Sequence, residues 1–209
     1  MKTTIVTPDL IQLTRLGFVN AFLVREDDGF TLVDTTTGGA ADALIEAART
    51  AGGAIRRIAL THGHGDHVGS LDALAGKLGV EVLMPELDAR IHAGEKVVDR
   101  KLTGSWPKLT TVPDVRLTGG DRVGSLEVVP APGHSPGHVA FVDTRDRSVI
   151  AGDTFTSIGR LNTTDRLRFP FPLASMATWN GETELASARV VRALEPTLMV
   201  VGHGPAVRN

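Results

Sequence analysis

Thr61-His62-Gly63-His64-Gly65-Asp66-His67 places three of the chain's seven histidines and one carboxylate within six positions. Alternate side chains of an extended segment share one side, so His62 and His64 can reach the same metal ion. Asp66 and His67 come where the chain enters a predicted helix, which directs them to a neighbouring point suited to a second ion. The spacing therefore predicts a metal site.

Three further candidate ligands follow apolar, strand-like segments, each directly after a glycine. They are His134 after residues 128–133, Asp153 after residues 149–152 and His203 after residues 199–202. His62 follows the apolar residues 58–60 in the same way. Because a rigid sheet fixes the positions of the loops at its strand ends, we expect these four strand ends to converge on one cleft.

The seven candidate ligands divide into two groups. Three nitrogens form one group (His62, His64 and His134), and the other holds Asp66, His67 and His203, with Asp153 bridging. A water shared by two ions about 3.5 to 4 Å apart has its pKa lowered toward about 7, which supplies hydroxide at neutral pH. Two divalent ions, two carboxylates and one hydroxide sum to a charge of +1, which favours a developing oxyanion. We expect Asp66 to orient the hydroxide and to shuttle its proton.

The composition is that of one globular domain over residues 1–209. Apolar residues make up 42% and charged residues 22% of the chain, and 22 basic against 24 acidic side chains give a formal charge of −2. At this length folding buries about 70% of the unfolded chain's surface, so the metals are expected to be functional rather than needed for a core. The balance of charge argues against a nucleic-acid partner. With neither an apolar leader nor a run of about 20 apolar residues, we expect a cytoplasmic protein that does not enter membranes.

The apolar pattern predicts sheets covered by helices. An Asp28-Gly29 turn between residues 18–24 and 30–34 indicates a hairpin. Further strands are predicted at 58–60, 80–83, 126–129, 139–142, 148–151 and 198–201, and helices at 40–51 and 68–78. A late helix is predicted to bury Ala186, Val190 and Leu194, and residues 85–114 to form a helix and a loop in which His92 is solvated. Hairpins make the sheets mixed, so the fold class is α/β.

These motifs together resemble the metallo-β-lactamase-fold hydrolases, in particular glyoxalase II and related lactonases. The similarity rests on the His62–His67 segment, on residues 132–138 (PGHSPGH), on Ala151-Gly152-Asp153 and on Gly202-His203-Gly204. The resemblance implies a four-layer αββα sandwich with a dinuclear site at one edge. It also implies that Asp34 supports the ligands and that the metals are zinc, with iron or manganese as alternatives. His138 is expected to support the ligands or the structure rather than to bind metal.

The chain departs from parts of this family in informative ways. It has no cysteine and therefore lacks the thiolate ligand of some lactamases, and it has no tyrosine, which is typical of the pocket of acyl-homoserine lactonases. It also stops six residues after His203, where glyoxalase II has a longer region that recognises glutathione. A glutathione thioester is therefore not the expected substrate.

We expect a hydrolase in which the bridging hydroxide attacks a carbonyl ester, thioester, lactone or amide of a small molecule. One alternative is an oxidoreductase resembling the persulfide dioxygenases, with a single iron on His62, His134 and Asp153. Others are a metal-dependent phosphodiesterase or ribonuclease and a non-catalytic metal-binding protein. The oligomeric state stays open. Candidate walls of the substrate pocket are Trp106, Phe155, Arg160, Arg166, Arg168, Phe169, Phe171 and Trp179.

Overall fold

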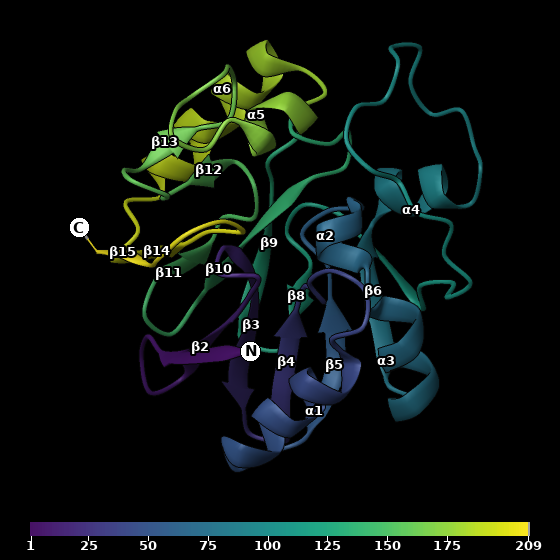
Figure 1. Ribbon diagram of the computed structural model, residues 1–209, viewed down its shortest axis with the longest axis vertical. Coiled ribbons are helices and arrows are strands. Elements are labelled where there is room, and N and C mark those ends of the chain that lie inside the picture. Colours follow the sequence, from purple (N-terminus) through teal and green to yellow (C-terminus); the bar gives the residue numbers. More distant parts are fainter. Residues whose placement is uncertain (209) are drawn as a thin grey trace.

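The first of two large sheets has seven strands that follow one another in chain order (Figure 1). The computed structural model describes residues 1–208. The strands are β1 (Lys2–Ile5), β2 (Leu10–Arg15), β3 (Val19–Glu26), β4 (Gly29–Val33), β5 (Ile55–Ala59), β6 (Glu81–Pro85) and β7 (Val115–Leu117). Strands β1 to β4 are antiparallel, and β4 to β7 are parallel. The predicted hairpin is present, with Glu26 paired to Gly29 across the turn.

The second large sheet has six strands in the order β15-β14-β11-β10-β9-β8. They are β8 (Arg122–Val123), β9 (Leu126–Pro130), β10 (Val139–Asp143), β11 (Ser148–Ile150), β14 (Leu198–Val200) and β15 (Val207–Arg208). Only the β11–β14 pair is parallel. Strands β12 (Phe155–Thr156) and β13 (Asn162–Thr163) pair separately. Both large sheets are mixed, as predicted.

Helices cover the outer face of each sheet and complete four layers. Helices α1 (Ala41–Thr50) and α3 (Leu71–Leu78) pack on the first sheet, and α6 (Gly181–Ala193) packs on the second. The shorter helices are α2 (Gly65–Val68), α4 (Glu86–His92) and α5 (Leu173–Ala177). The predicted αββα sandwich is therefore confirmed. Within residues 1–208, no helix is long and apolar enough to cross a bilayer.

Three apolar cores separate the four layers. On β3, Phe22 faces the core between the two sheets while Leu23 faces the core under α1 and α3, as the period of two in a strand requires. The core between the sheets also contains Phe141 of β10. The third core joins Val149 of β11 to Val191 of α6. Each sheet is thus held on both faces, and its strand ends are fixed in position.

The predicted buried face of the last helix is wrong at Ala186 and Val190, which are exposed, whereas Leu194 is partly buried and packs against the third core. In α6 the buried residues are Glu184, Ser187, Ala188 and Val191, whereas the side chain of Val190 is 50% exposed. Polar contacts set this orientation, because Ser187 donates a hydrogen bond of 2.6 Å to the carbonyl of Pro132. The apolar spacing alone does not report such contacts.

Candidate metal centre

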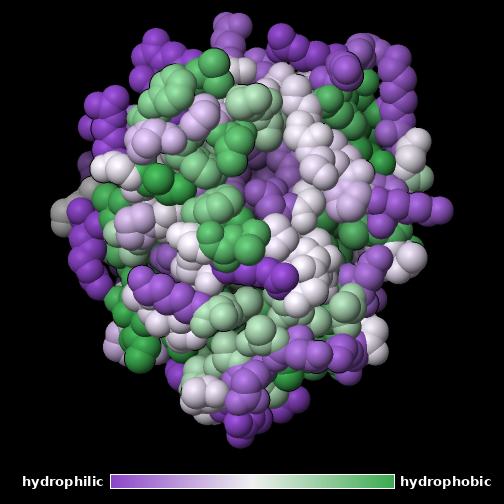
Figure 2. Space-filling view, in the orientation of Figure 1, coloured by the Kyte–Doolittle hydropathy of each residue, from purple (hydrophilic) through white to green (hydrophobic). Residues whose placement is uncertain are grey.

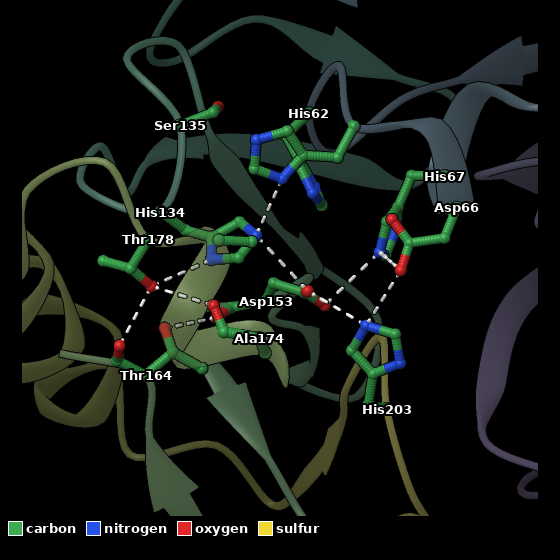
Figure 3. Close-up of polar contacts among 12 residues, drawn as sticks. His62, Asp66, His67, His134, Ser135, Asp153, Thr164, Ala174, Thr178 and His203 are labelled. Atoms are coloured by element: carbon green, nitrogen blue, oxygen red, sulfur yellow. Dashed lines mark hydrogen bonds and ion pairs between the residues drawn. The ribbon is translucent and has the colours of Figure 1, made fainter. Parts of the chain in front are cut away.

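The structure brings all seven predicted ligands together at one edge of the sandwich. Figure 3 labels all of them except His64. His62 follows β5, His134 follows β9, Asp153 follows β11 and His203 follows β14. The two sheets meet at this edge, where the Asn20 N–H on β3 donates to the carbonyl of Gly202 at 2.9 Å. Four strand ends therefore converge as the strand–glycine–ligand pattern predicted.

One group of ligand atoms comes from three imidazoles. Ring nitrogens of His62, His64 and His134 lie within 4.8 Å of one another. His64 Nδ1 and His134 Nε2 are 3.0 Å apart, and His134 Nε2 is 3.4 Å from Asp153 Oδ2. The geometry matches three nitrogens and one carboxylate oxygen around a common point.

The second group lies across Asp153 from the first. Asp66, His67 and His203 each offer one atom to a cluster that also spans at most 4.8 Å. His203 Nε2 is 3.3 Å from Asp66 Oδ2 and 3.1 Å from Asp153 Oδ2, and His67 Nε2 is 3.4 Å from Asp153 Oδ1. Asp153 is therefore placed between the two groups, where the sequence predicted a bridging ligand.

Several buried atoms of this cluster lack a hydrogen-bond partner within the described chain. They are His62 Nε2, His67 Nε2 and Asp153 Oδ1. An unsatisfied buried polar atom costs about 1–3 kcal/mol, so three at one point call for a ligand. Nitrogen and carboxylate oxygen are the donors that zinc and similar divalent ions prefer. The donor set therefore fits divalent metal ions.

The imidazoles of the first group are held in the neutral form that metal binding needs. Burial lowers the pKa of His62 and of His134 far below the usual range, and it lowers the pKa of His64 to about 4. The positive charges of neighbouring histidines lower the pKa of His62 further. At neutral pH these nitrogens carry free lone pairs.

In the second group the two histidines are protonated, so their protons occupy positions that metal ions would take. Burial opposes the charged form of His67 and His203, but neighbouring carboxylates outweigh it, that of Asp153 most strongly. The pKa of His67 is therefore raised well above the usual range, and the pKa of His203 is raised to about 9. Burial likewise raises the pKa of Asp66 and Asp153, yet the charges on the two histidines bring both below the usual range. Metal binding here is expected to release protons.

Asp34 lies directly behind the cluster and is fully buried. Its Oδ2 accepts from His67 Nδ1 at 2.8 Å and from the Thr61 hydroxyl at 2.8 Å, while Oδ1 accepts from the Thr61 N–H. The contact fixes the proton of His67 on Nδ1 and leaves Nε2 facing the other ligands. Asp34 adopts a φ of 62°, a left-handed conformation that aspartate tolerates better than most residues.

His138 contacts the backbone of one of the predicted ligands. Its Nε2 accepts a hydrogen bond of 3.0 Å from the backbone N–H of Asp153, whereas its buried Nδ1 has no hydrogen-bond partner among residues 1–208. Burial lowers the pKa of His138 to about 3, so the ring is neutral and available as this acceptor. That His138 supports the ligands or the structure, rather than binding metal, stays a prediction.

Sequence reasoning missed Asp88, a fully buried carboxylate on α4 that joins two ligand loops. Its oxygens accept from the Gly63 N–H at 2.8 Å, the Gly137 N–H at 2.7 Å and the Ser135 hydroxyl at 2.6 Å. Burial raises the pKa of Asp88 to about 6. Because this value is still below 7, most of the carboxyl group is ionised at neutral pH. Nothing in the local sequence of α4 distinguishes this aspartate from its acidic neighbour Glu86.

One further hydroxyl contacts a ligand ring from behind. Thr178, just after α5, places its hydroxyl 3.2 Å from His134 Nδ1.

The prediction that His92 is solvated is wrong. His92 is half-buried, and its ring nitrogens lie 2.9 Å from the Gly63 carbonyl and 3.1 Å from that of Pro107. The ring of His92 is drawn in because it hydrogen-bonds a buried backbone carbonyl, and the spacing of residues in the sequence does not reveal such a partner.

Some residues predicted to line the substrate pocket lie beside the metal ligands, and another lies in the core. The Trp106 ring lies edge-on to His64 at 5.1 Å, and the Phe171 ring is 5.0 Å from that of His203. Phe155 is instead buried with the core under α6, so its predicted place in the pocket wall is wrong.

Comparison with known families identifies the class of protein. The model of the metallo-beta-lactamase superfamily matches residues 14–203, which contain all seven predicted ligands. The chain therefore belongs to the metallo-beta-lactamase superfamily. Proteins similar to it include a probable metallo-hydrolase and a hydroxyacylglutathione hydrolase.

Two curated proteins illustrate how similar the chain is to individual members of the superfamily. An uncharacterized protein of Bacillus subtilis, YobT, is 37% identical over 198 residues, covering 91% of this chain and 85% of its own length. A hydroxyacylglutathione hydrolase of Rhodopseudomonas palustris is 34% identical over 147 residues, covering 65% of this chain and 51% of its own length. This chain thus matches about half the length of that hydrolase.

Solved structures agree with the four-layer fold. The protein TTHA1623, crystallised in a di-iron-bound form, is 30% identical with a TM-score of 0.71, covering 94% of this chain and 92% of that one. A metallo-beta-lactamase from Pontibacter korlensis shares the fold at 18% identity, with a TM-score of 0.75 and coverage of 99% and 93%.

Proposed function

We propose that the protein is a dinuclear metal-dependent hydrolase that acts on a carbonyl ester, thioester, lactone or amide of a small molecule. The observation that carries the proposal is the pair of ligand groups on either side of Asp153. A mononuclear site needs one such group, so the second argues for two ions. The surplus of ligands also leaves positions for solvent and substrate, unlike a closed structural site.

The metal site would be held by His62, His64, His134, Asp66, His67 and His203, with Asp153 between the groups. When bound, two divalent ions supply a nucleophilic water of lowered pKa and polarise a carbonyl oxygen. Zinc is the proposed metal because the donors are imidazole and carboxylate. Iron is the first alternative, since TTHA1623 was solved with two irons, and manganese is the second.

Asp66 is the member of the cluster best placed to move a proton. Its side chain is 38% exposed, whereas those of His67 and His203 are 0% and 3% exposed. As a carboxylate it can accept a proton from the attacking water, and its exposure lets that proton pass to the leaving group. Asp153, 3% exposed, is enclosed by imidazoles and is better suited to binding than to proton transfer.

A substrate panel with metal analysis tests the proposal. Metal-loaded protein is assayed against chromogenic esters, thioesters, lactones, β-lactams and a phosphodiester, and oxygen uptake is followed with a persulfide. Turnover of carbonyl substrates with two ions per chain is expected. Turnover of the phosphodiester alone, or oxygen uptake with one iron, would overturn the proposal in favour of a phosphodiesterase or a dioxygenase.

A further inference from the structure

Exposed apolar side chains concentrate in one short segment of the surface. In residues 1–208 ten large apolar side chains are exposed, and four of them lie within residues 167–176. These four form what we call the apolar rim: Leu167 at 63%, Phe169 at 77%, Leu173 at 55% and Met176 at 64% exposure. A cluster of this kind within ten residues is unusual for a surface where single apolar residues are scattered.

The segment that carries the apolar rim is attached directly to the candidate metal centre. Just before it, the Thr164 hydroxyl donates to the Asp153 carbonyl at 2.7 Å. Just after it, Thr178 contacts the ring of His134, and within it Phe171 lies against His203. The rim therefore sits on a segment fixed to the cluster at three points.

The opposite wall of the site is also partly apolar and is tied to the same segment. Thr103 donates to the Ala177 carbonyl at 2.7 Å, and its own carbonyl accepts from Trp106 Nε1 at 2.7 Å. In Figure 2 hydrophobic side chains gather at the upper left, where Figure 1 has α5 and its neighbours, and they border a hydrophilic hollow near the centre of the face. An occupant of the hollow thus has apolar surface beside it.

The charged groups within the segment balance one another only in part. Arg166 and Arg168 both lie beside Asp165, with nitrogen–oxygen distances of 3.7 and 3.6 Å. One positive charge of this group stays unbalanced, so a carboxylate bound beside the apolar rim is not repelled by it.

We infer that the apolar rim binds the acyl chain of a medium-chain aliphatic ester or thioester, whose carbonyl then lies over the metal centre. The inference rests on the proposed hydrolase function. In the reaction, water adds to the acyl carbon and the bond from that carbon to the ester oxygen or sulfur breaks. One proton of the water goes to the leaving alcohol or thiol and the other is released to solvent, so the products are a fatty carboxylate, that alcohol or thiol, and a proton.

Kinetics on a chain-length series test the inference. With p-nitrophenyl acetate, butyrate, hexanoate and octanoate, kcat/KM is expected to rise by about twofold to fourfold per methylene, the upper value corresponding to about 0.8 kcal/mol per buried methylene. Leu173 and Met176 are three apart on α5 and share a face, so the double variant Leu173→Gln/Met176→Gln changes polarity while conserving length and helix propensity. Its loss relative to the wild type should increase with chain length.

Ile5→Thr is the matched control, because Ile5 is 75% exposed but belongs to β1, in a groove lined by residues of α1. It should leave the chain-length dependence unchanged. A second readout needs no metal: calorimetric titration of metal-free protein with sodium decanoate should show binding that the double variant weakens at least fivefold and the control does not.

The outcomes separate the inference from the function on which it rests. If no ester, thioester, lactone or amide is hydrolysed, the hydrolase proposal fails, whereas decanoate binding still reports on the apolar rim. If esters are hydrolysed at rates independent of chain length and the double variant behaves as wild type, the inference fails and the hydrolase stands. A dimer in gel filtration that the double variant dissociates, without chain-length dependence, would also overturn it, because a second copy would then cover the rim.

Discussion

Asp88→Ala removes a carboxylate that ties the loop of His62 and His64 to the loop of His134. Three buried donors lose their acceptor: the N–H groups of Gly63 and Gly137 and the Ser135 hydroxyl. At about 1–3 kcal/mol for each unsatisfied donor, the loss is about 3–9 kcal/mol. Relief of the burial that raises the pKa of Asp88 to about 6 returns about 3 kcal/mol. We expect a net destabilisation of about 3 kcal/mol.

The same change should weaken metal binding, because both loops lose a shared support. Removal of such outer contacts typically costs about 10- to 100-fold in metal affinity. The assay is competition for Zn²⁺ against a chromogenic chelator, with urea unfolding of the metal-free protein measured in parallel.

Asp143→Ala is the matched control for Asp88→Ala. Asp143 is another buried aspartate that accepts several hydrogen bonds, including one of 2.9 Å from the Arg145 N–H, but it ends β10 at the end away from His138. The Asp143→Ala variant should have a lower free energy of unfolding but the same metal affinity as the wild type. Metal affinity within twofold of wild type for Asp88→Ala, or an equal loss in the control, would refute the reasoning.

Three further predictions follow from the same contacts. His64→Ala should lower the metal content from two ions to one and remove most turnover while the circular dichroism spectrum stays native; loss of folding would instead show that the ions are structural. Thr178→Val should weaken zinc binding about tenfold in the chelator assay, because the hydroxyl that orients His134 Nδ1 is lost, and an unchanged affinity would contradict that role. Burial raises the pKa of Asp88 from 3.8 to about 6, so its contribution to stability is full below about pH 4 and lost as the pH rises through about 6. The unfolding free energy of metal-free wild type minus that of Asp88→Asn should fall by about 3 kcal/mol from pH 4 to pH 7, and a flat difference would exclude this assignment.

The convergence of His62, His134, Asp153 and His203 was predictable because each of these four ligands follows an apolar strand. A glycine or threonine between strand and ligand marks the turn out of the sheet, and the sheet fixes the position, as for Asp153 after β11 and His203 after β14. The alternation of His62 and His64 was likewise readable from local geometry. A ligand can therefore be predicted from the sequence when its position is fixed by the strand that precedes it.

Features set by contacts between distant segments were not predictable. Asp88 lies on a short helix, and its partners Gly63 and Gly137 are 25 and 49 residues away. Glu184 was not expected inside, yet it is buried on α6 beside Thr164, whose hydroxyl lies 3.2 Å from its Oε1. The edge strand β1 was also missed, since all four of its residues are exposed and show no alternation.

Anomalous diffraction from crystals of the zinc-loaded protein tests the dinuclear centre most directly. We expect two peaks about 3.5–4 Å apart, one bounded by His62, His64 and His134, the other by Asp66, His67 and His203. Both peaks should contact Asp153. A single peak, or zinc bound only outside this cluster, would contradict it.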